Sequence, residues 1–221
     1  MPEKKESRSD DSLLPYSLFS SKPVSSHTPN GFKIIWSNKY PSIDIIEYDY
    51  EYNTLVKITN TPNTWERNLS YSLDGTKIIY TKEIFNDSSR YSSIWIMDYK
   101  YEDNFCVISE EDISQEVGSL HNPTLLLSNT RIGYYYSQLH SDSLFGIHSI
   151  NIDGTDNELI YDNHIDITNF IQLVPNRTEI VFCDHYDQYK IYKFDYNSHD
   201  VVELDEGEYP GISSDGSKIS Y

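Results

Sequence analysis

The chain has 221 residues, with 17 basic and 35 acidic side chains and a formal net charge of −18. A surface this acidic repels phosphate backbones and anionic lipids, which argues against nucleic-acid or membrane partners and favours a basic protein or peptide partner. The sequence has 20 Tyr, 8 Phe and 3 Trp but no Ala, a composition that favours strands over helices. We therefore expect a folded, all-β protein.

The N-terminal residues predict a tail rather than a targeting signal. Residues 1–22 are mostly polar, with a possible short strand at 13–19, and no apolar run is long enough for a signal peptide or a membrane span. We therefore expect a cytoplasmic protein. Cys106 and Cys183 lie far apart and lack the spacing of a zinc site, so we expect two reduced, packed thiols.

One pattern recurs five times between residues 23 and 221: a turn, a polar residue, and an apolar run that ends in an aromatic side chain. The turns are rich in Asn and Asp-Gly, which adopt the positive φ angles of tight hairpins. The five polar positions are spaced at intervals of about 40 to 55 residues, the period of a propeller blade. They are Lys33, Lys77, Arg131, Glu179 and Lys218. The aromatic positions, which we expect to pack between blades, are Trp36, Tyr80, Tyr134, Phe182 and Tyr221.

Each full repeat unit predicts four antiparallel strands, which is the composition of one propeller blade. The third strand of each unit ends in an Asp, and a fourth apolar segment follows a polar turn. These aspartates are Asp49, Asp98, Asp153 and Asp195. The predicted fold is a β-propeller with four complete repeats plus two strands of a fifth, an incomplete or open array. The predicted blades are 23–62, 63–112, 113–167 and 168–207, with a partial blade at 208–221.

The repeat resembles the TolB-type (WD40-like, PD40) β-propeller repeat, whose hallmark is Pro-x-Trp-Ser-Pro-Asp-Gly-x-Lys-Ile. The copy from Pro210 to Ile219 differs from that hallmark only in having Ile for Trp and Ser for the second Pro. The second copy keeps Ser72, Asp74, Gly75 and Lys77. The resemblance implies a scaffold that binds proteins, or a propeller domain attached to a peptidase.

The number of strands leaves closure of the propeller open. Four units and half of a fifth would leave unpaired strand edges at both ends. We weigh three explanations: the sequence is a fragment or a shortened product, the apolar segment 13–19 completes a small fifth blade, or two chains pair edge to edge as a homodimer.

No catalytic, phosphate-binding or dinucleotide motif occurs in the sequence. We therefore expect no enzymatic activity and no cofactor, and predict a non-catalytic β-propeller scaffold that binds a protein or peptide. The alternative is a propeller domain or fragment accessory to a hydrolase, such as a propeller-bearing serine peptidase, that binds peptide or glycan.

Six residues are candidates for binding. Trp65 and Arg67 lie in the predicted linker between the first two units, outside the repeat pattern, and an exposed Trp beside an Arg is typical of a binding hot spot. His121 begins the predicted first strand of the third unit and could face the central channel. The others, Asp184, His185 and Asp187, form an acidic loop that could hold a metal or a basic side chain, although such an acidic loop is usually only a solvated turn.

Two insertions point to one face of the scaffold. Residues 83–92 and 137–144 lengthen the predicted loops between the second and third strands of the second and third units. Loops on one face of a rigid repeat scaffold commonly carry recognition.

Overall fold

The computed structural model describes an all-β molecule. It covers residues 26–28, 33–37, 43–86, 89–98, 103–113, 118–126, 129–138, 146–161, 172–174, 178–184, 188–208, 210–213 and 216–221. The strands form four four-stranded antiparallel sheets and one two-stranded sheet, each made of strands that follow one another in the sequence. The predicted strand at 13–19 lies outside the described residues.

The sheets follow the chain in order. The first contains β1 (Ser26–His27), β2 (Lys33–Ser37), β3 (Ile45–Asp49) and β4 (Thr54–Lys57). The second contains β5 (Thr64–Tyr71), β6 (Lys77–Asn86), β7 (Ser89–Asp98) and β8 (Asn104–Ser109), followed by the short helix α1 (Glu110–Ile113). The third contains β9 (Gly118–Leu126), β10 (Arg131–Gln138), β11 (Gly146–Asn151) and β12 (Glu158–Tyr161). The fourth contains β13 (Gln172–Leu173), β14 (Glu179–Asp184), β15 (Lys190–Asp195) and β16 (Val201–Glu206), and the last pairs β17 (Gly211–Ile212) with β18 (Ile219–Ser220).

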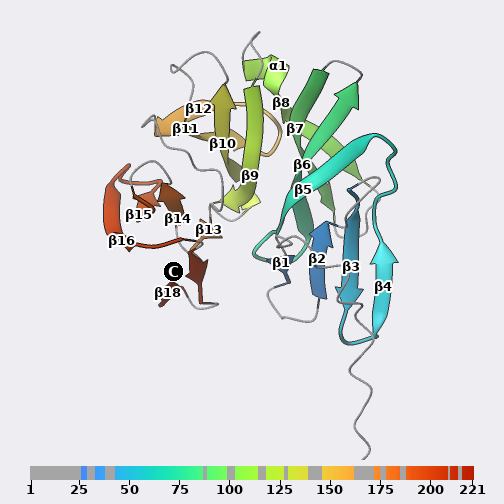
Figure 1. Ribbon diagram of the computed structural model, residues 1–221, viewed down its shortest axis with the longest axis horizontal. Helices are drawn as coiled ribbons and strands as arrows, with labels where there is room; N and C mark the ends of the chain where they lie inside the picture. The colour runs from blue at the N-terminus through green and yellow to red at the C-terminus, as the bar shows by residue number, and fades with distance from the viewer. Residues whose placement is uncertain are drawn as a thin grey trace, which may run out of the picture.

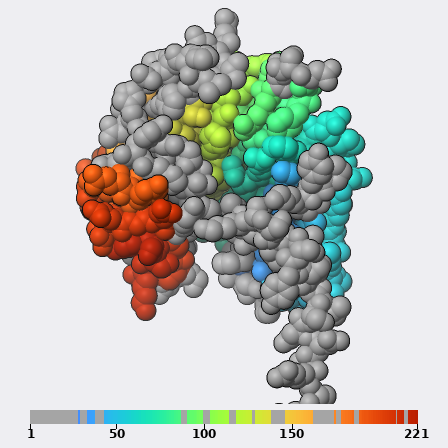
Figure 2. Space-filling view, viewed as in Figure 1, coloured from blue at the N-terminus to red at the C-terminus, as the bar shows by residue number. Residues whose placement is uncertain are grey.

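The sheets are arranged as blades around a common centre (Figure 1). The first strand of each sheet lies innermost: β1 contacts β5, β5 contacts β9, β9 contacts β13, and β13 contacts β17. The fourth strands lie outermost, and every residue of β4 is exposed at the rim, drawn cyan in Figure 2. This arrangement confirms the predicted propeller architecture of four-stranded antiparallel blades.

Apolar cores lie between neighbouring blades. Each core combines side chains from two consecutive sheets, and the last joins the fourth blade to β17 and β18. Ile78 packs towards the first blade and Ile79 towards the third, because successive side chains of a strand point to opposite faces. The apolar run of the repeat therefore serves two cores. Four of the repeated aromatic residues are buried as predicted, whereas Tyr221 is 52% exposed.

In the first, third and fourth blades the polar residue of the repeat forms an ion pair within its own blade. In the first blade Lys33 Nζ lies 2.8 Å from Glu47 Oε1. The fourth blade has the same pair with its charges exchanged, because Glu179 Oε1 lies 2.5 Å from Lys193 Nζ. Glu179 and Lys193 occupy the positions of Lys33 and Glu47 in the strand register. The negative charge of Glu179 in the fourth copy is therefore balanced by Lys193 on the neighbouring strand.

The repeated Asp shapes the turn that follows the third strand. The Asp49 carboxylate accepts hydrogen bonds from the backbone N–H groups of Glu51 and Tyr52, and Asp195 accepts one from Asn197 N at 2.7 Å. These hydrogen bonds lower the pKa of both carboxyl groups, although desolvation of Asp49 opposes the shift. In such turns the Asp carboxylate accepts hydrogen bonds from backbone N–H groups that no longer pair with a neighbouring strand.

Two details differ from the predictions. Most of residues 83–92 form strand rather than loop, because β6 and β7 pair in register from Lys77↔Asp98 to Asn86↔Ser89. Cys183 is buried as expected, but Cys106 is exposed on the outer strand β8, so only one thiol is packed. Neither thiol forms a disulfide.

No helix in the described part of the chain is long and apolar enough to span a membrane.

Candidate functional site

Arg67 and His121 occupy equivalent positions on neighbouring inner strands. Arg67 of β5 pairs with Thr81, and His121 of β9 pairs with Tyr135, each four residues after the basic residue that begins its partner strand. Both strands then bulge at an Asn with positive φ, Asn68 at 53° and Asn122 at 49°. A bulge re-aims the side chains beside it. The shared bulge therefore gives the inner ends of the second and third blades the same backbone shape.

Trp65 lies within β5, not in the linker that the sequence predicted. It pairs with Glu83 and forms a parallel bridge to Ile43, so the inner strand starts earlier than the repeat pattern indicates. Its ring centroid lies 4.2 Å from that of Phe85, and the Arg67 guanidinium lies 4.1 Å from the centre of the indole. Both contacts hold Trp65 in place between an aromatic side chain and a cation.

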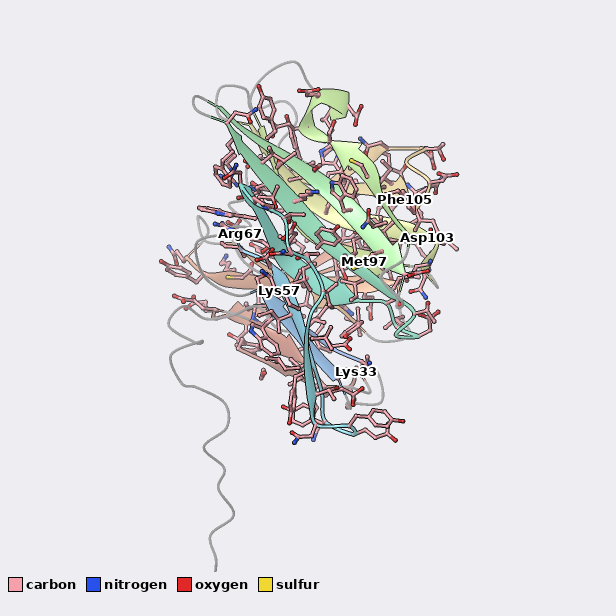
Figure 3. All side chains as sticks on the ribbon, turned by 90° about the vertical axis from the view of Figure 1, so that its right-hand side faces the viewer. Lys33, Lys57, Arg67, Met97, Asp103 and Phe105 are labelled. Carbon is pink, nitrogen blue, oxygen red and sulfur yellow. The ribbon has the colours of Figure 1, made fainter. Side chains whose placement is uncertain are left out.

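Glu83 is the buried charge of this site. It is 2% exposed, and its Oε1 lies 2.5 Å from Arg90 Nη2 on β7 while its Oε2 lies 3.8 Å from Arg67 Nε. The two arginine side chains are 36% and 41% exposed. Figure 3 shows Arg67 on the opposite side of the blade from Phe105, which belongs to the outer strand. We name Trp65, Arg67, Glu83, Phe85 and Arg90 the arginine cluster.

His121 borders the arginine cluster. One ring nitrogen, Nε2, lies 3.2 Å from Ser137 Oγ, and the ring centroid lies 6.1 Å from that of Tyr135. Desolvation, together with the positive charges of Arg90 and Arg67, lowers the pKa of His121 to about 4. The imidazole is therefore neutral at pH 7 and offers hydrogen bonding without charge.

Glu66 fixes the start of β5 from the opposite face. This carboxylate is 1% exposed and accepts hydrogen bonds from three threonine hydroxyls. The donors are Thr59 at 3.1 Å, Thr64 at 3.2 Å and Thr61. Burial raises the pKa of Glu66 although the three hydroxyls oppose that shift. The network ties Trp65 and Arg67 to the connection between the first two blades.

Asp184, the described residue of the predicted acidic loop, lies on the fourth blade, whereas the arginine cluster lies on the second. Asp184 ends β14, where it pairs with Lys190 and is buried. His185 and Asp187 lie outside the described residues. Within the described ranges, no group of three or more His, Cys, Asp or Glu side chains could hold a metal ion.

The sequence named three residues of this region but missed the others. Glu83, Phe85 and Arg90 were assigned to a loop, although residues 83–85 continue the strand that begins at Lys77. The aromatic and β-branched residues Ile84, Phe85 and Tyr91 are the signal that favoured strand there. Their meeting with Trp65 depends on the β5–β6 register.

Solved structures with the same architecture are similar to this chain. An oligogalacturonate lyase in complex with manganese has 13% sequence identity and a TM-score of 0.65, over 87% of this chain and 56% of that one. TolB from Acinetobacter baumannii has 14% identity and a TM-score of 0.63, over 85% of this chain and 44% of that one. Both are β-propellers. The fold is a β-propeller.

Propeller-bearing hydrolases also share the fold. The tricorn protease aligns with 88% of this chain at 13% identity and a TM-score of 0.61, which is 23% of the protease. The chain thus spans about half of the lyase and of TolB, and less of the larger enzyme. A scan of protein-family models finds no match, and no curated protein sequence is similar to the chain.

Proposed function

We propose that this propeller is a non-catalytic scaffold that binds a protein or peptide at the arginine cluster. The observation that carries the proposal is the packing of Trp65 between Phe85 and the Arg67 guanidinium at the inner end of the second blade. Trp and Arg are enriched among the residues that dominate binding energies, particularly where they are held before the partner arrives.

The scaffold around the arginine cluster supports this role. Glu66 and its threonine donors hold one side of β5, and on the other side the Arg67 guanidinium is held over the Trp65 indole. Side chains fixed in this way lose little conformational freedom when a partner binds, so more of the contact energy appears as affinity.

A peptide-display experiment tests the proposal. We expect the purified chain to enrich peptides from a random library, and Trp65→Ala to weaken their binding by about 30-fold, as expected for a hot spot of about 2 kcal/mol. Tyr52→Ala is the matched control, because Tyr52 is an exposed aromatic residue on the first blade, 70% exposed. Failure to enrich any peptide, or equal losses from both variants, would contradict the proposal. Thermal melts establish that both variants are folded.

A second candidate function is that of an accessory propeller to a hydrolase. The observation that favours it is the similarity in fold to the tricorn protease and a prolyl endopeptidase, of which the aligned parts are 23% and 30% of the respective chains. Sequencing the complete transcript distinguishes the two functions. A reading frame that continues into a hydrolase domain would support the accessory role, and one that encodes only propeller repeats would oppose it.

A further inference from the structure

The arginine cluster carries excess positive charge on a strongly acidic protein. It contains two guanidinium groups, Arg67 and Arg90, and one carboxylate, Glu83. Glu83 is buried, whereas both arginines are partly exposed. Among the described residues of the arginine cluster, the charges that a partner meets are therefore cationic, although the whole protein has a net charge of −18.

Within the part of the chain that the structure describes, both guanidinium groups retain unused hydrogen-bond donors. A guanidinium carries five N–H groups. Among the described residues, Arg90 donates one short hydrogen bond to Glu83, and the Arg67 Nε to Glu83 Oε2 distance of 3.8 Å is too long for one. The remaining N–H groups suit the two oxygens of a carboxylate, which arginine binds in a bidentate geometry.

The surroundings of the cations indicate the source of that carboxylate. A sugar ring binds by stacking on a free aromatic face, but the Trp65 indole already contacts Arg67 at 4.1 Å and Phe85 at 4.2 Å. The terminal carboxylate of a peptide is usually captured by backbone N–H groups, and here the donors belong to side chains. The apolar edge formed by Trp65 and Phe85 beside the cations fits a peptide in which an apolar residue neighbours an acidic one.

We propose that Arg67 and Arg90 together bind the carboxylate of an Asp or Glu side chain in a partner peptide. This inference rests on the proposed peptide-binding function, and it specifies the chemistry of the bound segment. Within a partner that is basic overall, one acidic residue beside an apolar residue would satisfy the arginine cluster. Arg67 is already held over Trp65, so its ordering does not oppose binding.

Three peptide-display libraries test the proposal with the whole 221-residue chain. One library has a fixed central Glu, one has no Asp or Glu and an amidated C-terminus, and one has no Asp or Glu and a free C-terminus. We expect binders from the first library only. For those binders, changing the central Glu to Gln should weaken binding at least tenfold.

Variants of the protein connect the carboxylate to the two arginines. Arg67→Gln and Arg90→Gln should each weaken the Glu-containing peptides at least tenfold, whereas Lys218→Gln, which removes an exposed cation beside β18, should change their affinity less than twofold. Glu83→Gln should strengthen the same peptides about threefold or more, because it removes the competing carboxylate. Misfolding of the variant cannot increase the affinity, so a tighter Glu83→Gln complex supports the proposal and an unchanged or weaker one contradicts it.

The outcomes separate this inference from the function on which it rests. Trp65-dependent binders without acidic side chains, from either of the other libraries, would leave the peptide-binding function intact and overturn the carboxylate assignment. Binding of a uronate oligosaccharide in place of peptides would overturn both proposals, as would the absence of any binder.

Discussion

Gly133 of β10 is the position at which the third blade makes room for the fourth. The equivalent positions of the first, second and fourth blades are Ile35, Ile79 and Val181. A Cβ atom on Gly133 would lie 2.3 Å from the hydroxyl oxygen of Tyr196, which follows β15 in the next blade. The Tyr196 hydroxyl therefore occupies the space that a side chain at position 133 would need. Substitutions at the two positions test the packing between the third and fourth blades.

The expected magnitudes follow from this contact. Gly133→Ala must displace the Tyr196 ring by about 1 Å, and overpacking of this kind lowers the free energy of unfolding by about 1–3 kcal/mol. Tyr196→Phe removes a buried hydroxyl without a hydrogen-bond partner in the described part of the chain, so we expect no loss of stability. In the double variant the nearest ring atom lies 3.4 Å from the new Cβ, and the nearest remaining atom is the Leu126 Cδ1 methyl group at 3.0 Å. The two substitutions should therefore couple by about 2 kcal/mol.

Urea unfolding, followed by tryptophan fluorescence and circular dichroism, measures the coupling. Gly133→Ala should lower the midpoint in the natural background and lower it much less in the Tyr196→Phe background, where only the contact with the Leu126 methyl group remains close. Tyr91→Phe is the control partner, because Tyr91 is exposed on the second blade and its effect should add to that of Gly133→Ala within about 0.5 kcal/mol. Equal destabilisation by Gly133→Ala in both backgrounds would refute the packing of Tyr196 against this glycine.

Three further predictions concern single residues. His121 has a pKa near 6.5 in the unfolded state and near 4 in the folded state, so the free energy of unfolding should fall by up to about 3 kcal/mol as the pH falls from about 6.5 to about 4. His121→Asn should flatten this part of the pH dependence of the urea midpoint. An unchanged pH dependence in the variant would contradict the burial of a neutral His121. Asn122 has a φ of 49°, a conformation that glycine adopts more easily than alanine, so Asn122→Ala should be about 1 kcal/mol less stable than Asn122→Gly in the same unfolding assay. Equal stabilities of the two variants would argue against the bulge. Exposed Cys106 should react with a thiol reagent in the folded protein and buried Cys183 only after unfolding; equal rates would contradict their placement.

Part of the arginine cluster was visible in the sequence and part was not. Trp65 and Arg67 drew attention because they fall outside the repeat, and His121 because it begins the predicted first strand of the third unit. Nothing local in the sequence connects them with Glu83, Phe85 or Arg90. Those contacts depend on the β5–β6 register, which pairs Trp65 with Glu83, and on the β6–β7 hairpin, which pairs Phe85 with Arg90. The bulge at Asn68 sets part of that register.

The sequence by itself determined the blades, because each depends on local signals. Turn residues with positive φ, such as Gly75 and Gly216, and apolar runs at a regular spacing are short-range features that specify a four-stranded antiparallel unit. Tertiary structure decided how the units meet. Ile78 and Ile79 are equivalent apolar residues in the sequence, yet they enter different cores because each blade has a neighbour on both faces. Likewise, only the approach of Tyr196 explains a glycine where the other full blades have a branched side chain.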